Sequence, residues 1–248
     1  MAGGEWFEDE KFWAAYASTM FDEERWAEVP EIVDRIERLA RPAPGAAVLD
    51  ACCGPGRHSI ELASRGYRVT GVDITEVYLE AARASAEGLP DVRFIRADIR
   101  KFEERGEFDL AINLFTSFGY FAKPEDDLEA LRRIRTSLKP GGKLVLETQG
   151  KETTVRDFVE GESFERAGCQ VRTEYSVVGP WEGLRERWIL EREGSPEADF
   201  SFVLRLYSAV EMRASLLQAG FETADIFGDL DGSPYDQRAK SLVALAIA

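Results

Sequence analysis

The stretch that decides the fold is "VLDACCGPGRHS", residues 48–59. An apolar run here ends at Asp50, is followed by Gly54 and Gly56, and leads into the helical segment "RHSIELASRG". Glycines after a buried strand let the backbone approach a ligand closely, and the N-terminus of the next helix offers free N–H donors. The stretch therefore predicts a strand, a ligand-binding loop and a helix, in that order.

The two adjacent cysteines of this loop do not favour a metal or redox site. Only one other cysteine, Cys169, follows Cys52 and Cys53, and an odd count without regular spacing is not a disulfide framework. Structural zinc sites use a Cys-x2-Cys spacing, which adjacent cysteines do not provide. We therefore predict no metal and no disulfide, with Cys52 and Cys53 serving as small loop residues in a reducing compartment.

The composition bounds the partners that the chain can have. With 248 residues there is room for one α/β domain with an insertion. A net charge of −15, from 46 acidic and 31 basic residues, disfavours a nucleic-acid partner. No apolar run approaches the ~20 residues of a bilayer span, and the start "MAGGEWFEDE" is acidic. We expect a cytoplasmic monomer or homodimer without membrane contact.

Strand-like and helix-like segments alternate outward from the loop. The expected strands are 46–52, 67–74, 92–98, 108–115 and 143–149, and the expected helices between them are 57–66, 75–87 and 124–142. Strict alternation of this kind builds a doubly wound, Rossmann-like parallel sheet. A further helix at 208–220, with a Ser208/Glu211 capping box, and strands at 221–227 and 241–248 complete the sheet.

Two regions depart from the alternation and divide the chain. Residues 1–40 are helical and aromatic-rich, with Phe12, Tyr16 and Met20 on one helical face. Residues 151–207 hold three strand-like segments, 170–178, 184–193 and 200–207, the first two joined by a five-residue hairpin loop. We therefore expect an N-terminal helical lid (1–40), a core (41–150), an antiparallel insertion that caps the acceptor (151–207) and a core completion (208–248).

Acidic residues end three successive strands. Asp50 ends the first strand, Asp73 ends the second in "GVDIT", and Asp98 ends the third in "RADIR". In a doubly wound sheet, ligands bind outside the carboxyl ends of the strands. Asp73 is placed to accept hydrogen bonds from ribose hydroxyls, and Asp98 from an adenine amino group. Any one of these acids could be an ordinary helix cap, but their joint placement predicts a nucleoside site.

Five motifs, "VLDACCGPG", "GVDIT", "FIRADI", "FDLAINLF" and "LKPGGKLVLET", resemble the successive motifs of class I S-adenosylmethionine-dependent methyltransferases. The resemblance spans residues 45–150. It implies a seven-stranded sheet of order 3-2-1-4-5-7-6 with an antiparallel seventh strand. It also implies a transferase of the EC 2.1.1 class, which uses S-adenosyl-L-methionine, releases S-adenosyl-L-homocysteine and needs no metal.

The same resemblance implies cofactor contacts in four loops. Those near the methionine moiety are Asp50, Ala51, Cys52, Gly54, Asn113 and Leu114; those near the ribose and adenine are Asp73, Ile74, Asp98 and Ile99. One position departs from the family pattern, because Cys52 stands where the family's loop has its first glycine. Cysteine tolerates fewer backbone conformations than glycine, and we expect Cys52 to keep its main-chain contact.

Arg57 and His58 follow the loop in the first turn of the helix. A cation there opposes the helix dipole by ~0.3–1 kcal/mol, so an anionic partner such as the cofactor's carboxylate would relieve it. The alternative is that Arg57 reaches a surface acid. His58, the chain's single histidine, is either a base or a structural residue.

The acceptor is expected to lie between the lid and the loop after the fourth strand. Phe12, Trp13, Tyr16 and Phe21 would close one side, with Phe115, Phe118 and Tyr120 beneath, unless these aromatics are plain core. "NLFTSFG" lacks the Asn-Pro-Pro-Tyr pattern of enzymes that methylate nucleobase amines, which favours a small-molecule acceptor. Candidate acceptor residues are Phe115, Thr116, Ser117, Tyr120, Trp181 and Tyr207, and candidate catalytic residues are Tyr16, His58 and Tyr120. The Tyr16 hydroxyl could serve either cofactor or acceptor.

Two other functions remain open at the level of sequence. An NAD-dependent oxidoreductase shares the sheet and the acid after strand two, but it expects a Gly-x-Gly-x-x-Gly loop where this chain has Cys-Cys-Gly-Pro-Gly-Arg. A non-catalytic binding module with a methyltransferase-like fold would not need the set of strand-end acids. In-line methyl transfer depends mainly on positioning, so the lack of a catalytic triad does not exclude it.

Overall fold

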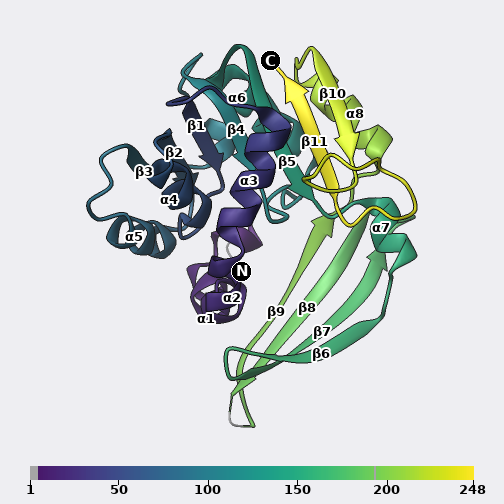
Figure 1. Cartoon of the computed structure of the whole chain (residues 1–248). Coiled ribbons are helices and arrows are strands. Elements are labelled where there is room, and N and C mark those ends of the chain that lie inside the picture. Colours follow the sequence, from purple (N-terminus) through teal and green to yellow (C-terminus); the bar gives the residue numbers. More distant parts are fainter. Residues whose placement is uncertain (1–4, 193) are drawn as a thin grey trace.

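The computed structural model describes residues 5–192 and 194–248, which form a seven-stranded sheet and a separate four-stranded sheet (Figure 1). The seven-stranded sheet has the order β3-β2-β1-β4-β5-β11-β10. Its strands are β1 (Ala47–Ala51), β2 (Arg68–Asp73), β3 (Val92–Arg96), β4 (Phe108–Asn113), β5 (Leu138–Thr148), β10 (Thr223–Phe227) and β11 (Leu242–Ile247). Neighbouring strands run parallel except that β11 is antiparallel to both β5 and β10. The predicted order 3-2-1-4-5-7-6 is confirmed.

Helices cover both faces of this sheet, and the alternation of strand side chains decides which helix each residue meets. Val48 of β1 packs with Val33 of α3 and Leu62 of α4, whereas its neighbour Leu49 packs on the opposite face with Leu131 of α6. The helices are α1 (Glu10–Met20), α2 (Glu23–Ala27), α3 (Val29–Ala40), α4 (Arg57–Ser64), α5 (Glu76–Ser85), α6 (Pro124–Ser137), α7 (Lys151–Arg156) and α8 (Ala209–Gln218), with short 3-10 turns η1 (Trp6–Glu8) and η2 (Ile99–Lys101).

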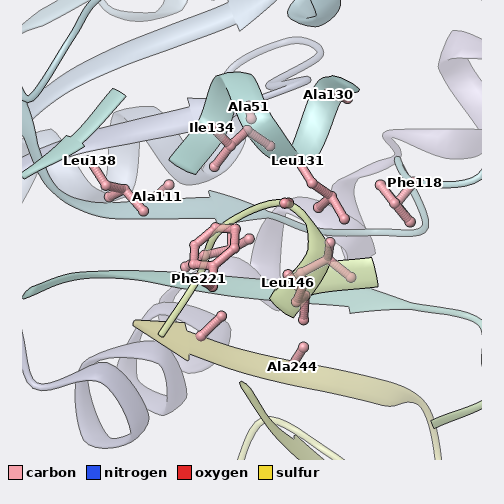
Figure 2. Packing of buried hydrophobic residues seen from close by; sticks show 14 of the residues in the cluster. Ala51, Ala111, Phe118, Ala130, Leu131, Ile134, Leu138, Leu146, Phe221 and Ala244 are labelled. Atoms are coloured by element: carbon pink, nitrogen blue, oxygen red, sulfur yellow. The ribbon is translucent and has the colours of Figure 1, made fainter. Parts of the chain in front are cut away.

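Figure 2 shows the packing on the α6 side of the sheet. Small residues Ala111 and Ala244 alternate along it with the larger Leu146, and Leu131 and Ile134 of α6 lie against them. Small strand residues under bulky helix residues let the two layers interdigitate without voids. This dense layer fixes the ends of β1 and β4, from which two of the site's loops leave.

The second sheet is an antiparallel meander that extends away from the core (Figure 1). It contains β6 (Gly161–Arg166), β7 (Cys169–Val178), β8 (Gly183–Arg192) and β9 (Ser195–Arg205). The sequence predicts the last three of these strands and misses β6, because this edge strand is mostly exposed and its charged residues hide the apolar alternation. A parallel bridge between Gly150 and Tyr207 joins the two ends of the segment to each other.

The N-terminal helix α1 packs against the second sheet through the face that the residue spacing predicts. Phe12 and Tyr16 are fully buried there with Val171 of β7 and Leu190 of β8. The Tyr78 hydroxyl of α5 donates to the Trp13 carbonyl (2.8 Å), which ties α1 to the core as well. Helix α1 therefore bridges the two sheets.

No helix in the described parts of the chain has the length and apolar character that crossing a membrane requires.

Candidate functional site

A cavity of about 530 Å3 lies where the carboxyl ends of β1, β2 and β4 face helix α1 and the second sheet. Asp50, Asp73 and Asp98 line one wall, and Trp13, Trp188 and Phe202 line the opposite one. Pockets of 300–1,000 Å3 are typical for small-molecule ligands. The strand-end acids that the sequence pairs with a nucleoside are thus brought to one cavity.

The loop after β1 has the tight left-handed turns that its glycines predict. Gly54 and Gly56 have φ of 54° and 75°, and a Cβ at Gly56 would lie 2.8 Å from the Phe94 ring. Cys52 also has a positive φ of 63°, although it carries a side chain. A left-handed conformation costs a residue with a Cβ roughly 1–2 kcal/mol, so the glycine-type turn of the family is retained here at a cost.

The two thiols of this loop are held in the neutral form. Burial raises the pKa of Cys53 well above its ordinary value, and burial together with Asp73 and Asp50 raises that of Cys52. The Cys53 N–H donates to the Val72 carbonyl (3.0 Å), which anchors the loop to β2. A neutral thiol is a poor nucleophile and metal ligand.

Asp73 is fixed by backbone donors at the end of β2. Its Oδ2 accepts from the Gly54 N–H and its Oδ1 accepts from the Thr75 N–H, each at 2.8 Å. A carboxylate oxygen can accept more than one hydrogen bond, so this side chain could also accept from a ligand hydroxyl. Burial raises the pKa of Asp73, and the backbone hydrogen bonds oppose that rise.

Asp50 and Asp98 are each held mainly by one neighbouring residue, Ser59 for Asp50 and Arg100, through both its backbone N–H and its side chain, for Asp98. Asp50 is 3% exposed and accepts from the Ser59 hydroxyl at 2.6 Å, and burial raises its pKa to about 6. Asp98 forms an ion pair with Arg100 at 2.7 Å. Burial alone would raise the pKa of Asp98, but hydrogen bonds from Arg100 outweigh it and the pKa is lowered.

Arg57 carries a buried guanidinium that lines the cavity. The residue is 3% exposed, its Nη1 donates to the Arg25 carbonyl (2.6 Å), and it stacks on the Phe115 ring at 4.8 Å. Within the described residues it forms no ion pair, so the predicted alternative of a surface acid is wrong. Burial lowers its pKa to about 10, which still leaves it charged at neutral pH. Nearby acids act on its charge from beyond ion-pair distance. A buried cation without a direct ion pair favours an anionic ligand.

His58 lines the cavity beside Arg57 but is a weak base. Burial, together with the charge of Arg57, lowers its pKa to about 3. Its Nε2 is buried without a hydrogen-bond partner among the described residues. An imidazole with so low a pKa keeps its single N–H proton and does not take up a second one at physiological pH.

The remaining cofactor candidates divide into two groups. Ile74, Ile99 and Leu114 line the cavity. Ala51 and Asn113 do not, because the Asn113 amide donates to the Ala51 carbonyl at 2.9 Å and both lie behind the loop.

The acceptor candidates divide in the same way. Phe115, Thr116, Ser117 and Tyr120 line the cavity, the first two with φ of 62° and 58°. Trp181 does not line it. This residue lies in the turn between β7 and β8, where its ring packs on Phe158.

Two tyrosines singled out by the sequence are occupied elsewhere. The Tyr16 hydroxyl donates to the Trp188 carbonyl at 2.6 Å, and Tyr16 does not line the cavity. The Tyr207 hydroxyl donates to the buried Asp127 at 2.8 Å, also outside the cavity. The Tyr16 phenol therefore joins α1 to the second sheet, and the Tyr207 phenol joins the segment after β9 to α6. Among the aromatics expected in the lid, Phe12, Trp13 and Phe21 line the cavity. Phe118, expected beneath the lid, lies in the core.

Sequence reasoning missed the residues that the second sheet contributes. The chief one is Glu186, which lines the cavity from β8 and is 8% exposed. Its Oε2 accepts from the Trp188 indole N–H at 3.0 Å, and burial raises its pKa to about 7. The sequence does contain one sign of this residue. Leu184, Glu186, Trp188 and Leu190 occupy every second position of the strand and so share one face, which places an acid among apolar residues.

Comparison with known proteins points to one enzyme family. A family model described as "Methyltransferase domain" matches residues 48–142. YqeM of Bacillus subtilis (strain 168), named as a methyltransferase, is 32% identical over 204 residues, which cover 77% of this chain and 81% of YqeM. The dTDP-3-amino-3,4,6-trideoxy-alpha-D-glucopyranose N,N-dimethyltransferase of Streptomyces venezuelae is 26% identical over 211 residues, covering 83% and 87% of the two chains.

A solved structure agrees over nearly the whole length. CalS10 of Micromonospora echinaspora, an amino pentose methyltransferase solved with S-adenosylmethionine bound, superposes with a TM-score of 0.68 and 27% identity. The match covers 96% of each chain, so it includes the second sheet and the N-terminal helices as well as the core.

Proposed function

The chain belongs to the class I S-adenosylmethionine-dependent methyltransferases, and from this premise we propose that it methylates a small-molecule acceptor held beneath α1 and the second sheet. The observation that carries the proposal is the single cavity shared by the strand-end acids and the aromatic wall. The names of two relatives, an amino-sugar dimethyltransferase and an amino pentose methyltransferase, support a small acceptor. The family membership leaves no basis for the NAD-dependent alternative.

The residues of the first wall fit S-adenosylmethionine. Asp73 would accept from the ribose hydroxyls through its fixed oxygens. Ile74 and Ile99 would pack on the adenine, and Asp98 would accept from its amino group. The buried guanidinium of Arg57, which has no direct ion pair among the described residues, fits the carboxylate of the methionine moiety.

The loop after β1 would hold the rest of the methionine moiety. Asp50 faces the cavity there, and Cys52 and Gly54 present main chain in left-handed turns. When bound, the cofactor supplies a methyl group on a sulfonium, whose sulfur leaves as a neutral thioether in S-adenosylhomocysteine. The protein's part is to hold the acceptor in line and to exclude water.

The architecture supports separate roles for different segments of the chain. We infer that residues 41–150 and 208–248 form the cofactor-binding core, that 1–40 form a lid and that 151–207 form the acceptor cap. The net charge of −15 supports an acceptor other than nucleic acid. In the same proposal the enzyme is of the EC 2.1.1 class, works in the cytoplasm without a metal or a membrane, and acts as a monomer or homodimer.

Calorimetric titration with S-adenosylmethionine, S-adenosylhomocysteine and NAD tests the proposal first. We expect both sulfur nucleosides to bind and NAD not to bind. Incubation with S-adenosylmethionine and a panel of amino sugars and other small amines and alcohols should then yield S-adenosylhomocysteine and a product heavier by one methylene, measured by mass spectrometry. Binding of NAD without either sulfur nucleoside would refute the proposal. Cofactor binding without turnover on any panel member would favour the non-catalytic module.

A further inference from the structure

Glu186 differs from the other carboxylates of the cavity in its partners. Asp73 accepts from two backbone N–H groups, Asp98 is paired with Arg100, and Asp50 accepts from a serine. Glu147 accepts from the Phe115 N–H at 3.3 Å and lies near Arg25. Glu186 has one neutral donor, the Trp188 indole, and forms no ion pair within the described part of the chain.

Aromatic rings surround the space that Glu186 faces. Trp6 stacks on Phe202 at 4.4 Å between ring centroids and meets Tyr120 at 4.7 Å, and all three line the cavity with Trp188. The faces of such rings attract cations, most strongly where water is excluded. This wall thus combines a carboxylate that has no paired cation with several aromatic rings whose faces attract a cation.

Tyr120 links this space to the cofactor loop. Burial raises the pKa of the Tyr120 phenol, and the nearby charges of Glu186 and Asp73, together with Cys52, raise it further. The phenol also lines the same cavity as Glu186 and the loops after β1 and β2. A group bound at Glu186 shares the cavity with whatever those loops hold.

Resting on the proposed function, we propose that the acceptor is a basic amine on an apolar body, bound as an ammonium ion by the Glu186 carboxylate and the aromatic rings around it. A buried carboxylate without a counter-ion is costly, and an ammonium ligand supplies the missing charge and the missing donors together. A neutral alcohol would supply one donor but no charge. The amine class is thus selected by the charge of this one side chain.

The same side chain can free the nitrogen for methylation. An Oε atom of ionised Glu186 takes one proton from the ammonium, so that an N–H bond breaks, an O–H bond forms and the electron pair stays on nitrogen. The carboxylic acid then returns its proton to solvent. Burial brings the pKa of Glu186 to about 7, near the value that suits proton exchange at neutral pH. The titratable groups facing it, Tyr120 and Tyr175, have raised pKa values and stay neutral.

The test compares two probes of equal shape, cyclohexylamine and cyclohexanol. Their binding to the full-length protein saturated with S-adenosylhomocysteine is measured by ligand-observed NMR titration slightly above neutral pH. We expect the amine to bind at least about tenfold more tightly than the alcohol. In E186Q, whose amide oxygen can still accept from Trp188, the preference should fall below about threefold, and E186D should restore part of it.

A matched control removes a carboxylate from the same sheet outside the cavity. Glu174 lies on β7 beside β8 and accepts from the exposed Arg187, so E174Q should keep the full amine preference. Equal affinity for both probes, no saturable amine binding, or an undiminished preference in E186Q would each overturn the inference. Calorimetry with S-adenosylhomocysteine on the same samples separates the two proposals, because its failure refutes the cofactor assignment whereas its success with no amine preference refutes only the role of Glu186.

Discussion

The two walls of the cavity are built in different ways. On the wall that we propose holds the cofactor, here called the cofactor wall, Asp73 and Asp98 are held by groups within a few residues of themselves or by the adjacent loop. On the wall that we propose holds the acceptor, here called the acceptor wall, Trp6, Tyr120 and Phe202 come from three distant parts of the chain and meet only through tertiary packing. The first wall is fixed by hydrogen bonds and the second by ring contacts.

This difference suits the two ligands of a methyltransferase. The cofactor is constant across the family, so rigid carboxylates at strand ends can serve every member. The acceptor varies, and a wall of side chains on an inserted sheet can change without disturbing the core. Glu186 is the exception on the second wall, because it is a polar group whose stability cost is not offset by local partners.

The largest expected effect is a change in the free energy of unfolding when Glu186 is replaced by glutamine. The pKa of Glu186 is raised from 4.5 to about 7 by burial. A raised folded-state pKa contributes stability below the unfolded value that is lost as the pH rises through the folded value. We therefore expect E186Q to match wild type near pH 4 and to exceed its free energy of unfolding near pH 8 by on the order of 3 kcal/mol.

Urea denaturation of both proteins across this pH range measures the effect. Asp50 and Asp127, whose pKa values burial raises to about 6, are present in both proteins and cancel in the difference. If the free energies of unfolding of wild type and E186Q changed in parallel with pH, Glu186 would already have a counter-charge. The carboxylates of both walls would then be paired.

The same contrast explains how far the sequence could be interpreted. Asp50, Asp73 and Asp98 could be predicted because each lies at or near the carboxyl end of its own strand, so strand order alone brings them together. The N-terminal aromatic face was also visible in its helical spacing. Tyr16, Trp181 and Tyr207 lie outside the cavity because each has a partner elsewhere, respectively the Trp188 carbonyl, the Phe158 ring and the Asp127 carboxylate. Such long-range contacts leave no local signal in the sequence.

The location of Glu186 in the cavity could not be predicted from the sequence, for a related reason. Its position depends on which face of β8 meets the cavity, and that is set by packing against α1. The alternation along β8 shows an acid on an apolar face, but nothing local says what that face covers. Long-range packing, rather than local propensity, decides this wall.

The second largest effect is expected on the cofactor wall. Asp73→Ala removes a charged acceptor and should weaken binding of S-adenosylhomocysteine by about 1.5–3 kcal/mol, roughly 10- to 150-fold, in calorimetric titration. Asp225→Ala, at an exposed position on β10, is the control and should bind normally. Unchanged affinity in Asp73→Ala would refute the proposed role of Asp73 in binding the ribose hydroxyls.

Arg57→Met should produce a smaller loss that depends on the ligand. The guanidinium is assigned to the carboxylate of the methionine moiety, so S-adenosylhomocysteine should bind roughly tenfold more weakly. The analogue 5′-methylthioadenosine lacks that carboxylate and should bind the variant and the wild type equally. An equal loss for both ligands would mean that Arg57 only supports the loop through Arg25 and Phe115.

The smallest effect is expected at Cys52, where the cofactor wall departs from its family's glycine. Cys52→Gly relieves the left-handed strain at φ 63°, and the greater freedom of glycine in the unfolded chain offsets part of the gain. The free energy of unfolding should therefore rise by no more than about 1 kcal/mol, measured in urea. Affinity for S-adenosylhomocysteine should stay within about twofold, because only the main chain of this residue is assigned to the cofactor. A tenfold loss would instead assign the thiol itself to the ligand, and the cofactor wall would then depend, like the acceptor wall, on a side chain that its family does not share.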